Sequence, residues 1–585
     1  MNQPIYPSIQ LKANLMIRAW LKSFFVLGLF LITAYPGFSR KNAQQNQQHQ
    51  HHSDRYDVIV YGGTAAGVMA AIAASRMGAK VLLLSPDKHL GGVTTSGLGW
   101  TDIGNPVTIG GLARSFYHQI WLHYQKDSSW KVSNLTTYQK KLYGYYKIKD
   151  SLMWTFEPHV AENILNKMLE QSGIDLITST RLDRSRKLNI KKSKDKTGHI
   201  IYAIRMVDGN SYQGSVYIDA SYEGDLMAMA GVSFTVGREA NSKYGETING
   251  VEKALTIKNN LPRGIDPYKI KGDSNSGILD GVLPYLHTED GEGDDKLQAY
   301  CYRMCLTNDS ANRIMVQKPD GYKKADFELV TRAAALGEKR FWKLSALPNQ
   351  KIDANNDSGI SMDAIGWNAG YVTATDNQRA VIAARHKYWT LGLIWTVQND
   401  PAMPPVIRKR FGTWGLPKDE FTDNGHFPYA LYVREARRMI GDYVISQQDV
   451  LKGDAENAIA MGSYVMDSHN TQRYITAQGD VQNEGDVQIA VKNPYQIPYG
   501  AIIPPKSQCQ NLLVPVCLSA SHIAYGSIRM EPVFMCVAEA AGTAAAIASK
   551  KHQSVQQVAY PELRSALDKA GQVMEIKPDI EVKHP

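Results

Sequence analysis

A run of small residues near the start of the chain is the first feature able to bind a ligand. The segment GGTAAG (62–67) follows a strand-like apolar run, YDVIVY (56–61), and leads into an Ala-rich segment with helical character. Gly62 permits a tight turn, and Gly67 permits close packing of helix on strand. Amides at a helix N-terminus are free to receive an anion, which the helix dipole favours. The pattern therefore predicts a pyrophosphate site built from Gly62, Gly63, Thr64, Ala66 and Gly67.

A second glycine pair indicates which dinucleotide is bound. The next strand-like run, KVLLLS (80–85), is followed closely by KHLGGVTTSGLGWTD (88–102), which contains Gly91 and Gly92. This pair resembles the glycine motif of two-dinucleotide-binding flavoproteins and has no use in an NAD site, so we predict FAD. The pattern departs from GxGxxG at Thr64, and the strand end that usually carries an acidic ribose ligand holds Ser85, with Asp87 two residues later. Either side chain is a candidate for the ribose.

Later segments are expected to complete this fold. FEPHVAENILNKMLEQ (156–171) predicts a helix starting at Pro158, and the strand expected over 174–182 would meet adenine through the backbone at Leu182. A predicted β-meander over 198–221 ends beside the cofactor at Ala220 and Ser221. The segment 509–550 predicts a strand, a loop and a long helix whose N-terminus, with Arg529 and Glu531, points at the flavin.

A chain of 585 residues exceeds one ordinary domain. We expect an α/β protein whose Rossmann-like, two-dinucleotide-binding-type FAD domain is discontinuous in sequence and contains an inserted α+β substrate or cap domain. In chain order we expect a signal peptide (1–39), a disordered linker (40–54), the N-terminal portion of the FAD domain (55–243), the cap (244–427), the C-terminal portion of the FAD domain (428–550) and a C-terminal tail (551–585).

The N-terminus resembles an export signal. Arg18 and Lys22 precede the apolar run FFVLGLFLITAY (24–35), and Gly37 and Ser39 offer small residues for cleavage. The run is short for a membrane span, and no twin-arginine pair precedes it. We expect a Sec-type, cleaved signal and a periplasmic or secreted protein with no transmembrane span in the mature chain. An uncleaved membrane anchor is the alternative.

Charge and cysteine usage exclude several functions. The net charge of +9 is dispersed, and its densest run, KLNIKKSKDKTGH (187–199), lacks interleaved aromatics. That run predicts a solvated hairpin rather than a nucleic-acid site. Five cysteines are too few for a disulfide scaffold, and their spacing suits no iron–sulfur cluster. Buried free thiols are expected, and we predict no metal site.

Three residues are candidates for catalysis: His522, His469 and Arg434. A flavoenzyme that takes hydride from a carbon bearing a hydroxyl needs a base for the hydroxyl proton, and a histidine suits that work near neutral pH. His522 precedes the flavin-facing helix, whereas His469 depends on the fold to bring it there. The segment LYVREARRMIGDYV (431–444) is expected to form a helix with Arg434 in an arginine cluster. The cluster can bind an anion or pair with carboxylates such as Glu435.

A polar segment in the expected cap has two interpretations. LPNQKIDANNDSGISMDAIGWN (347–368) contains Lys351, Asp353, Asn355 and Asn356 in a turn-forming context. It forms either a surface turn or a polar wall that contacts a hydroxylated substrate.

Seven segments together resemble the bacterial FAD-dependent oxidoreductase family, within the glutathione-reductase and fumarate-reductase-like flavoprotein superfamily. They are GGTAAG, HLGGVTTSGLGWTD, FEPHVAE, YIDASYEGDLMA, LYVREARRMIGDYV, MDSHNTQR and LSASHIAYGSIRMEPVFM. The resemblance extends from about residue 55 to about residue 550. Some exported members carry the label xanthan lyase. The resemblance implies bound FAD and oxidoreductase activity.

We therefore expect an exported enzyme that transfers hydride from a hydroxylated, sugar-derived small substrate to flavin N5. The electron acceptor would be a quinone, oxygen or a redox protein, because no second dinucleotide fold is evident between residues 231 and 427. Two rivals stay open. One is a carbohydrate-active lyase or carbohydrate-binding protein that keeps FAD as a structural element, and the other is a flavin-binding scaffold without catalysis.

Overall fold

The computed structural model describes residues 55–142 and 148–576. The predicted signal peptide and linker lie outside these residues. The central sheet has the strand order β3-β2-β1-β6-β5-β4, and β22 pairs with β6. The strands are β1 (Arg55–Tyr61), β2 (Val81–Leu84), β3 (Asp175–Ile177), β4 (Asn189–Lys192), β5 (His199–Arg205), β6 (Ser211–Asp219) and β22 (Leu512–Leu513). The pairs among β3, β2, β1, β6 and β22 are parallel, whereas β5 runs antiparallel to β4 and β6. The predicted α/β class is confirmed.

The interior of the sheet follows from its apolar strands. Val58 of β1 stands between Val81 of β2 and Val216 of β6, and all three side chains are buried. A parallel strand that is covered on both faces needs apolar residues on both sides, as YDVIVY provides.

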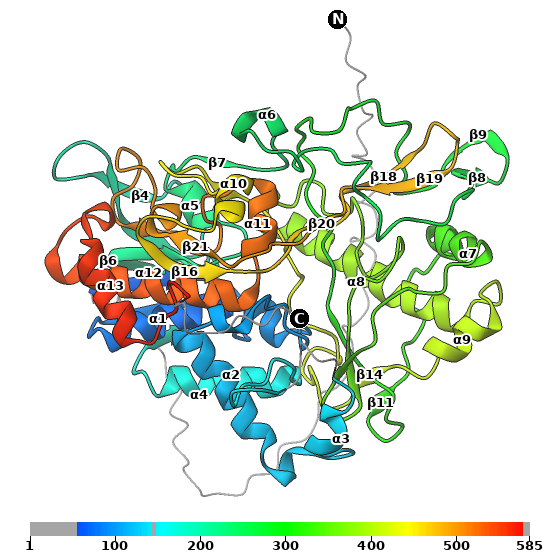
Figure 1. Ribbon diagram of the computed structural model, residues 1–585, viewed down its shortest axis with the longest axis horizontal. Helices are drawn as coiled ribbons and strands as arrows, with labels where there is room; N and C mark the ends of the chain where they lie inside the picture. Colours follow the sequence, from blue (N-terminus) through cyan, green and yellow to red (C-terminus); the bar gives the residue numbers. More distant parts are fainter. Residues whose placement is uncertain (1–54, 143–147, 577–585) are drawn as a thin grey trace, which may run out of the picture. The chain divides into compact units, whose positions relative to one another are not determined.

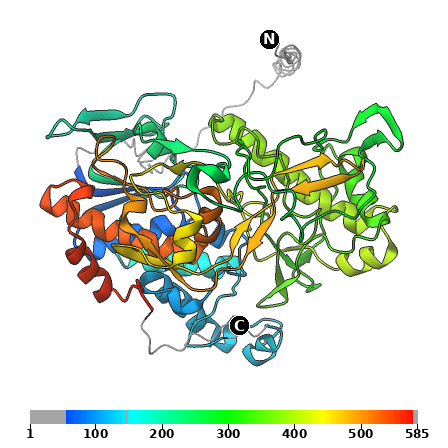
Figure 2. The ribbon, with the colours of Figure 1, turned by 45° about the horizontal axis from the view of Figure 1, so that its top comes forward.

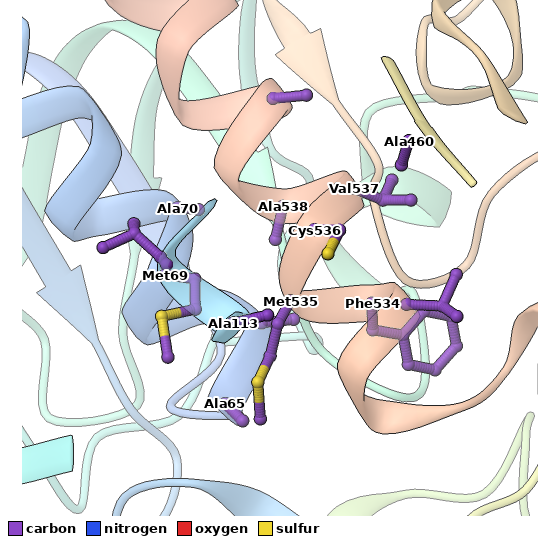
Figure 3. Packing of buried hydrophobic residues seen from close by; sticks show 14 of the residues in the cluster. Ala65, Met69, Ala70, Ala113, Ala460, Phe534, Met535, Cys536, Val537 and Ala538 are labelled. Atoms are coloured by element: carbon purple, nitrogen blue, oxygen red, sulfur yellow. The ribbon is translucent and has the colours of Figure 1, made fainter. Parts of the chain in front are cut away.

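Two helices of small residues pack together beside the sheet. Helix α1 (Ala65–Arg76) lies against α12 (Glu531–Lys551), although more than 450 residues of chain separate their starts (Figure 1). A Cβ at Gly542 of α12 would lie 2.1 Å from the carbonyl oxygen of Ala70, so the helices touch through backbone. Figure 3 shows the shared buried cluster, with Ala65, Met69 and Ala70 on α1 and Met535 and Ala538 on α12.

Further helices cover this unit. They are α2 (Gly111–Tyr124), α4 (Pro158–Glu170) and α13 (Tyr560–Lys569). Pro158 occupies the first turn of α4, as predicted. In the portion of the chain that the structure describes, α12 alone is long and apolar enough to cross a membrane, and that stretch is wholly buried within the protein.

The middle of the chain forms a second core of mixed helices and strands, drawn in green in Figure 2. Its longest elements are α7 (Glu328–Ala335), α8 (Asp376–Asn399), α9 (Pro405–Phe411) and the sheet of β10 (Met304–Thr307), β13 (Lys351–Ala354) and β12 (Ser345–Leu347). Two-stranded pairs are β8 (Tyr268–Ile270) with β9 (Asp273–Ile278), β11 (Arg313–Ile314) with β14 (Leu416–Pro417), and β18 (Gln472–Ile475) with β19 (Val481–Glu484).

Short elements connect these regions. The helices are α3 (Leu135–Gln139), α5 (Asp225–Met229), α6 (Asn241–Tyr244), α10 (Gln447–Lys452) and α11 (His522–Ile528). The strands are β7 (Phe234–Thr235), β15 (Arg438–Met439), β16 (Ala458–Gly462), β17 (Met466–Ser468), β20 (Val487–Ile489) and β21 (Tyr495–Pro498). The 3₁₀ turns are η1 (Gly92–Thr95), η2 (Pro106–Thr108), η3 (Asp127–Ser129), η5 (Lys324–Phe327), η6 (Tyr499–Ile502) and η7 (Val555–Gln557).

Two local predictions were wrong, and one of two alternatives is excluded. Residues 431–444 form no helix and include only the short strand β15 and one isolated bridge, because their arginines reach partners in several other segments. The strand expected over 174–182 is the shorter β3, with one bridge between Leu182 and Met206. The segment 347–368 is no surface turn, since Lys351, Asp353, Asn355 and Asn356 are buried.

Two others were confirmed. The basic run 187–199 lies in the exposed β4–β5 hairpin, whose strand β4 is solvated along its length. All five cysteines are free and buried.

Candidate functional site

A cleft of about 230 Å³ lies at the carboxyl ends of β1, β2 and β6. Its floor is Gly62, Gly63 and Thr64, and its walls include Asp87, Leu182 and Ser221. Ligands of open α/β sheets bind outside the carboxyl ends of the strands. The predicted glycine turn therefore stands where a dinucleotide would be held.

The glycines of this turn are required by close backbone approach. Gly62 has φ +115°, and a Cβ there would lie 2.7 Å from the carbonyl carbon of Ala220. A Cβ on Gly67 would lie 1.9 Å from the carbonyl oxygen of Gly62, which is the helix-on-strand contact that the sequence predicted. A Cβ on Gly63 would lie 2.1 Å from Ser85 Oγ.

The N-terminus of α1 is open to an anion. Thr64 caps the helix, because its Oγ1 accepts the Gly67 amide at 3.1 Å and donates to the Ala220 carbonyl at 2.8 Å. The first amides of a helix have no acceptor within it, so those of Ala65 and Ala66 stay available for a phosphate. The residues present thus fit the diphosphate of FAD.

We expect Gly67→Ala to abolish FAD binding and lower the free energy of unfolding. The added methyl group meets a main-chain carbonyl that no side-chain rotation can move, and overpacking of this kind costs about 1–3 kcal/mol or more. Absorbance of bound flavin and urea unfolding measure the two effects. Gly500→Ala is the control, because its Cβ would make an ordinary 3.5 Å contact with Tyr443. Retention of flavin by Gly67→Ala would contradict this role of the turn.

The structure separates the two ribose candidates. Ser85 is buried, and its Oγ donates to the Asp87 carbonyl at 2.8 Å and accepts the Asp87 amide at 3.2 Å. Ser85 thereby shapes the turn, whereas Asp87 is exposed and lines the cleft. Asp87 is the better placed of the two for a ribose hydroxyl.

At the other end of the cleft, three side chains meet over the second glycine pair. Tyr222 Oη donates to Glu531 Oε1 at 2.8 Å and accepts the Val93 amide at 3.2 Å. Thr94 Oγ1 donates to Glu531 Oε2 at 2.6 Å. A Cβ on Gly92 would lie 2.5 Å from Tyr222 Oη, so the glycine is needed beside this ring. These contacts tie η1 and the loop after β6 to the N-terminus of α12.

Glu531 makes stability depend on pH. Burial raises the pKa of Glu531 from 4.5 to about 7, although its bonds with Thr94 and Tyr222 oppose the rise. A raised carboxyl pKa stabilises the fold at low pH, and this contribution is lost as pH rises from about 4.5 to 7. We expect Glu531→Gln to be more stable than the parent at pH 7.5 by up to about 3 kcal/mol and similar to it at pH 4.5. Urea unfolding at both pH values measures this, and equal differences at both would refute it.

His469 lies in a chain of alternating charges. Its Nδ1 is 2.7 Å from Asp363 Oδ2, and its Nε2 is 3.3 Å from Asp467 Oδ2. Burial raises the pKa of Asp363, but Arg434 and His469 outweigh this effect and lower it to about 2. Both ring nitrogens of His469 thus face carboxylate oxygens, which accept hydrogen bonds and do not donate them when ionised. His469 is therefore poorly suited to act as a base.

The ends of this chain are arginines. Arg434 Nη2 is 2.8 Å from Asp363 Oδ1, and Arg529 Nη2 is 2.9 Å from Asp467 Oδ2. The five groups are buried together and link segments that lie far apart in sequence. Arg529, which lies two residues before α12 begins, also donates to Tyr432 Oη at 3.1 Å.

His522 has a different pair of partners. Its Nδ1 is 2.8 Å from Glu435 Oε2, and its Nε2 is 3.0 Å from Ser468 Oγ. Burial raises the pKa of Glu435, but His522 and Arg438 outweigh it and hold the pKa below its usual range. Nδ1 therefore donates to a carboxylate, which leaves the Nε2 lone pair facing a hydroxyl. The imidazole can accept a proton through Ser468.

The arginines next to Arg434 are partnered by carboxylates. Arg437 Nη1 is 2.8 Å from Asp225, and Arg438 is 2.8 Å from Glu239 and 2.7 Å from Glu435. Sequence analysis left open whether these arginines bind an anion or pair with carboxylates, and here they pair with carboxylates. The pairs connect residues 434–438 to several other segments.

The structure gathers the predicted catalytic residues into one buried cluster. Gln298 joins the two histidines, since its Nε2 donates to Glu435 at 2.9 Å and its Oε1 accepts the His469 amide at 3.2 Å. None of His522, His469 and Arg434 lines the cleft of the glycine turn. Of the other predicted cofactor residues, Gly92, Leu182 and Ser221 line that cleft, whereas Arg529 and Glu531 do not. Gly91 donates its amide to the Gly63 carbonyl, and Leu182 donates its amide to Tyr61 Oη.

Sequence reasoning missed Tyr222, Asp363 and Ser468. Tyr222 follows the predicted strand end DAS directly, so an aromatic residue at that position was a usable signal. Asp363 and Ser468 had no local signal, because their partners are brought to them from distant segments.

A second charged cluster surrounds Lys351. Glu157, His159 and Glu420 bring potential metal ligands within 4.8 Å of one another. Lys351 Nζ lies 2.7 Å from both Glu157 and Glu420 and 2.8 Å from Asp419. The ammonium group thus neutralises these carboxylates where a cation would otherwise be bound, and the cluster joins the start of α4 to the second core.

The fold and the glycine turn define a dinucleotide-binding α/β protein. The chain belongs to the FAD dependent oxidoreductase family, whose profile matches residues 57–567. It is thus an FAD-dependent oxidoreductase, and the predicted cofactor and family are confirmed. No curated protein matches the chain.

Solved structures show only distant likenesses. OxyS anhydrotetracycline hydroxylase from Streptomyces rimosus is 15% identical, with a TM-score of 0.22, over 32% of this chain and 36% of its own. THI4 from Thermovibrio ammonificans is 13% identical, with a TM-score of 0.22, over 31% of this chain and 64% of its own. The chain thus spans less than two thirds of either protein, and such likenesses say nothing about substrate.

Proposed function

We propose that the protein oxidises a hydroxylated, sugar-derived small substrate, with His522 accepting the hydroxyl proton. FAD, when bound, supplies a two-electron acceptor for hydride at flavin N5. The observation that carries the proposal is the Glu435–His522–Ser468 arrangement, because it leaves one imidazole nitrogen able to accept a proton. His522 begins α11, which leads directly to α12.

The chain's own residues provide a route for the proton. Ser468 Oγ donates to His522 Nε2 and can take a proton from a substrate hydroxyl in the same event. The imidazolium that forms is stabilised by Glu435, whose carboxylate faces Nδ1 at 2.8 Å. Glu435 is oriented in turn by Arg438 and Gln298.

Positive charge stands near the start of α12. Arg529 is 3% exposed and is held between Asp467 and Tyr432. A buried guanidinium and a helix N-terminus both favour negative charge on a neighbouring group. This supports a role for Arg529 in stabilising the reduced cofactor.

The test is anaerobic addition of candidate sugars and sugar acids to the purified holoprotein. Loss of the flavin absorbance of the oxidised state, with one equivalent of carbonyl product, is the expected result. Unsaturated products with the flavin left oxidised would instead establish the lyase. Absence of both across the panel would favour the scaffold.

We also propose that the protein is exported by a cleaved signal at residues 1–39 and passes electrons to a quinone, oxygen or a redox protein. The apolar run 24–35 between basic and small residues supports export. Cell fractionation and the N-terminal sequence of the mature protein test this. A cytoplasmic protein that retains Met1 would contradict it.

A further inference from the structure

A second cleft, lined by residues of the second core, has no role so far. It measures about 930 Å³ and is bordered by residues 280–283, 295–297, 365–373 and 471–473 and by α8. It adjoins the cofactor cleft across one segment. Tyr371 and Arg379 line the cofactor cleft, whereas Val372 and Arg385 line the larger one.

Aromatic rings with polar edges contribute to its wall. The Arg385 guanidinium lies 5.0 Å from the centroid of the half-buried Trp367 ring. Tyr388 Oη donates to Asp326 at 2.7 Å and accepts the Lys323 amide at 3.0 Å. Flat apolar surfaces bordered by fixed polar groups suit a ring that has one apolar face and hydroxyls at its edge.

The charges of the wall are unbalanced. Among residues 55–142 and 148–576, no carboxylate lies within 4.0 Å of the cationic groups of Lys323, Arg385 or Arg473. Two acidic residues of the wall do have cationic partners, since Asp280 pairs with Lys269 and Asp295 pairs with Lys296. Asp326 is then the one wall carboxylate left to balance Lys323, Arg385 and Arg473, so a net positive charge faces the cleft.

Arg473 is the most informative of these cations. It is 3% exposed, yet its hydrogen bonds go to neutral oxygens, at 3.0 Å to Asn483 Oδ1 and at 3.1 Å to the Gly359 carbonyl. Burial lowers the pKa of Arg473 from 12.5 to about 10, although the charge of Asp363 opposes this shift. Buried cations without a counter-charge are unfavourable unless a ligand supplies it.

We propose that this cleft binds an acidic saccharide, with its carboxylate at the cationic wall of Arg385, Arg473 and Lys323 and a sugar ring on Trp367. That this ligand is also the substrate of the enzyme rests on the proposed function. Binding itself requires only the cleft. The arrangement names a carboxylated sugar as the class of hydroxylated compound that the protein recognises.

The test is calorimetric titration of the holoprotein with the trimer of galacturonic acid and, separately, with its methyl ester. The acid should bind about tenfold or more tightly than the neutral ester, because a charge-assisted hydrogen bond is lost in the ester. Arg385→Gln should weaken binding of the acid about tenfold and leave the ester unchanged. Trp367→Ala should weaken the binding of both the acid and the ester.

The control variant is Lys387→Gln, on the same helix. Lys387 packs over Phe427 and does not line the cleft, so this variant should bind the acid as the parent does. Equal binding of acid and ester, or unchanged binding by Arg385→Gln, would overturn the proposal. Because Arg385 is exposed, its replacement is not expected to disturb folding.

The outcomes separate this cleft from the redox function. Binding of the acid that depends on Arg385, with no flavin reduction by any sugar, would support the cleft and reject the proposed oxidation. Flavin reduction by a neutral sugar, with no binding of the acid, would support the oxidation and reject the cleft.

Discussion

Lys351→Met is expected to lower the free energy of unfolding by about 3–5 kcal/mol at pH 7, the usual result of leaving buried charges without their partner. Lys351 is wholly buried and contacts Glu157, Asp419 and Glu420. Burial lowers the pKa of Lys351, but Glu420 and Glu157 outweigh it and raise that pKa above its usual value. Its loss leaves three carboxylates close together with no ammonium group between them.

The loss of unfolding free energy caused by Lys351→Met should become smaller as the pH falls. Burial raises the pKa of Asp419 and of Glu420, but Lys351 and their hydrogen bonds outweigh it and hold both below their usual ranges. The parent protein therefore loses this stabilisation on acidification. In the variant these carboxylates lack the buried cation, so their protonation relieves the repulsion between them, and the difference in unfolding free energy between variant and parent narrows toward pH 4.

Urea unfolding at pH 4.5 and 7 measures both effects. Lys131→Met is the matched control, because Lys131 contacts the same Asp419 at 2.9 Å from a position that is 62% exposed. Its loss should be below about 1 kcal/mol. Similar losses for the two lysines would show that the buried cluster does not hold the cores together.

His522→Gln is expected to slow flavin reduction by about 10²–10⁴-fold once a substrate is known, the usual effect of losing a general base. Glutamine keeps a hydrogen-bond donor for Glu435 but cannot accept a proton from Ser468 at neutral pH. Flavin content and the dissociation constant of the substrate should stay close to those of the parent. Stopped-flow absorbance under anaerobic conditions gives the rate.

Two further variants decide what the His522 result means. His386→Gln replaces another buried histidine, whose Nδ1 contacts only the Ile382 carbonyl, and should leave the rate unchanged. Ser468→Ala should slow the reaction if the hydroxyl relays the proton. A normal reduction rate in His522→Gln that still binds FAD would remove the histidine from the mechanism.

Local patterns were sufficient to predict the dinucleotide fold. The strand, glycine turn and helix of residues 56–76 have recognisable local signals, among them the Thr64 side chain that accepts the Gly67 amide and caps the helix. Apolar runs also predicted β2, β6 and α12, because strands and helices of a buried layer must be apolar whatever their partners are.

The arginine segment 431–444 shows where such patterns fail. Arginine, glutamate and alanine favour a helix, yet Arg434, Arg437 and Arg438 pair with carboxylates from three other segments. Leaving a buried charge unpaired costs about 3 kcal/mol or more, whereas helix propensity contributes less than about 1 kcal/mol per residue. The pairing of these arginines therefore outweighs their preference for a helix. The non-helical backbone allows each of these side chains to reach its partner.

The sequence by itself determined the layered α/β fold, through its apolar periodicity and glycine turn, and the family and FAD, through the resemblance of its motifs to known flavoproteins. Only the tertiary structure decided which side chains face each histidine. His469 and His522 have similar local surroundings, but Asp363 comes from more than 100 residues away to meet one and Glu435 from more than 80 to meet the other. The proton affinity of a histidine depends on its neighbours in space, and the local amino-acid sequence does not show which residues these are.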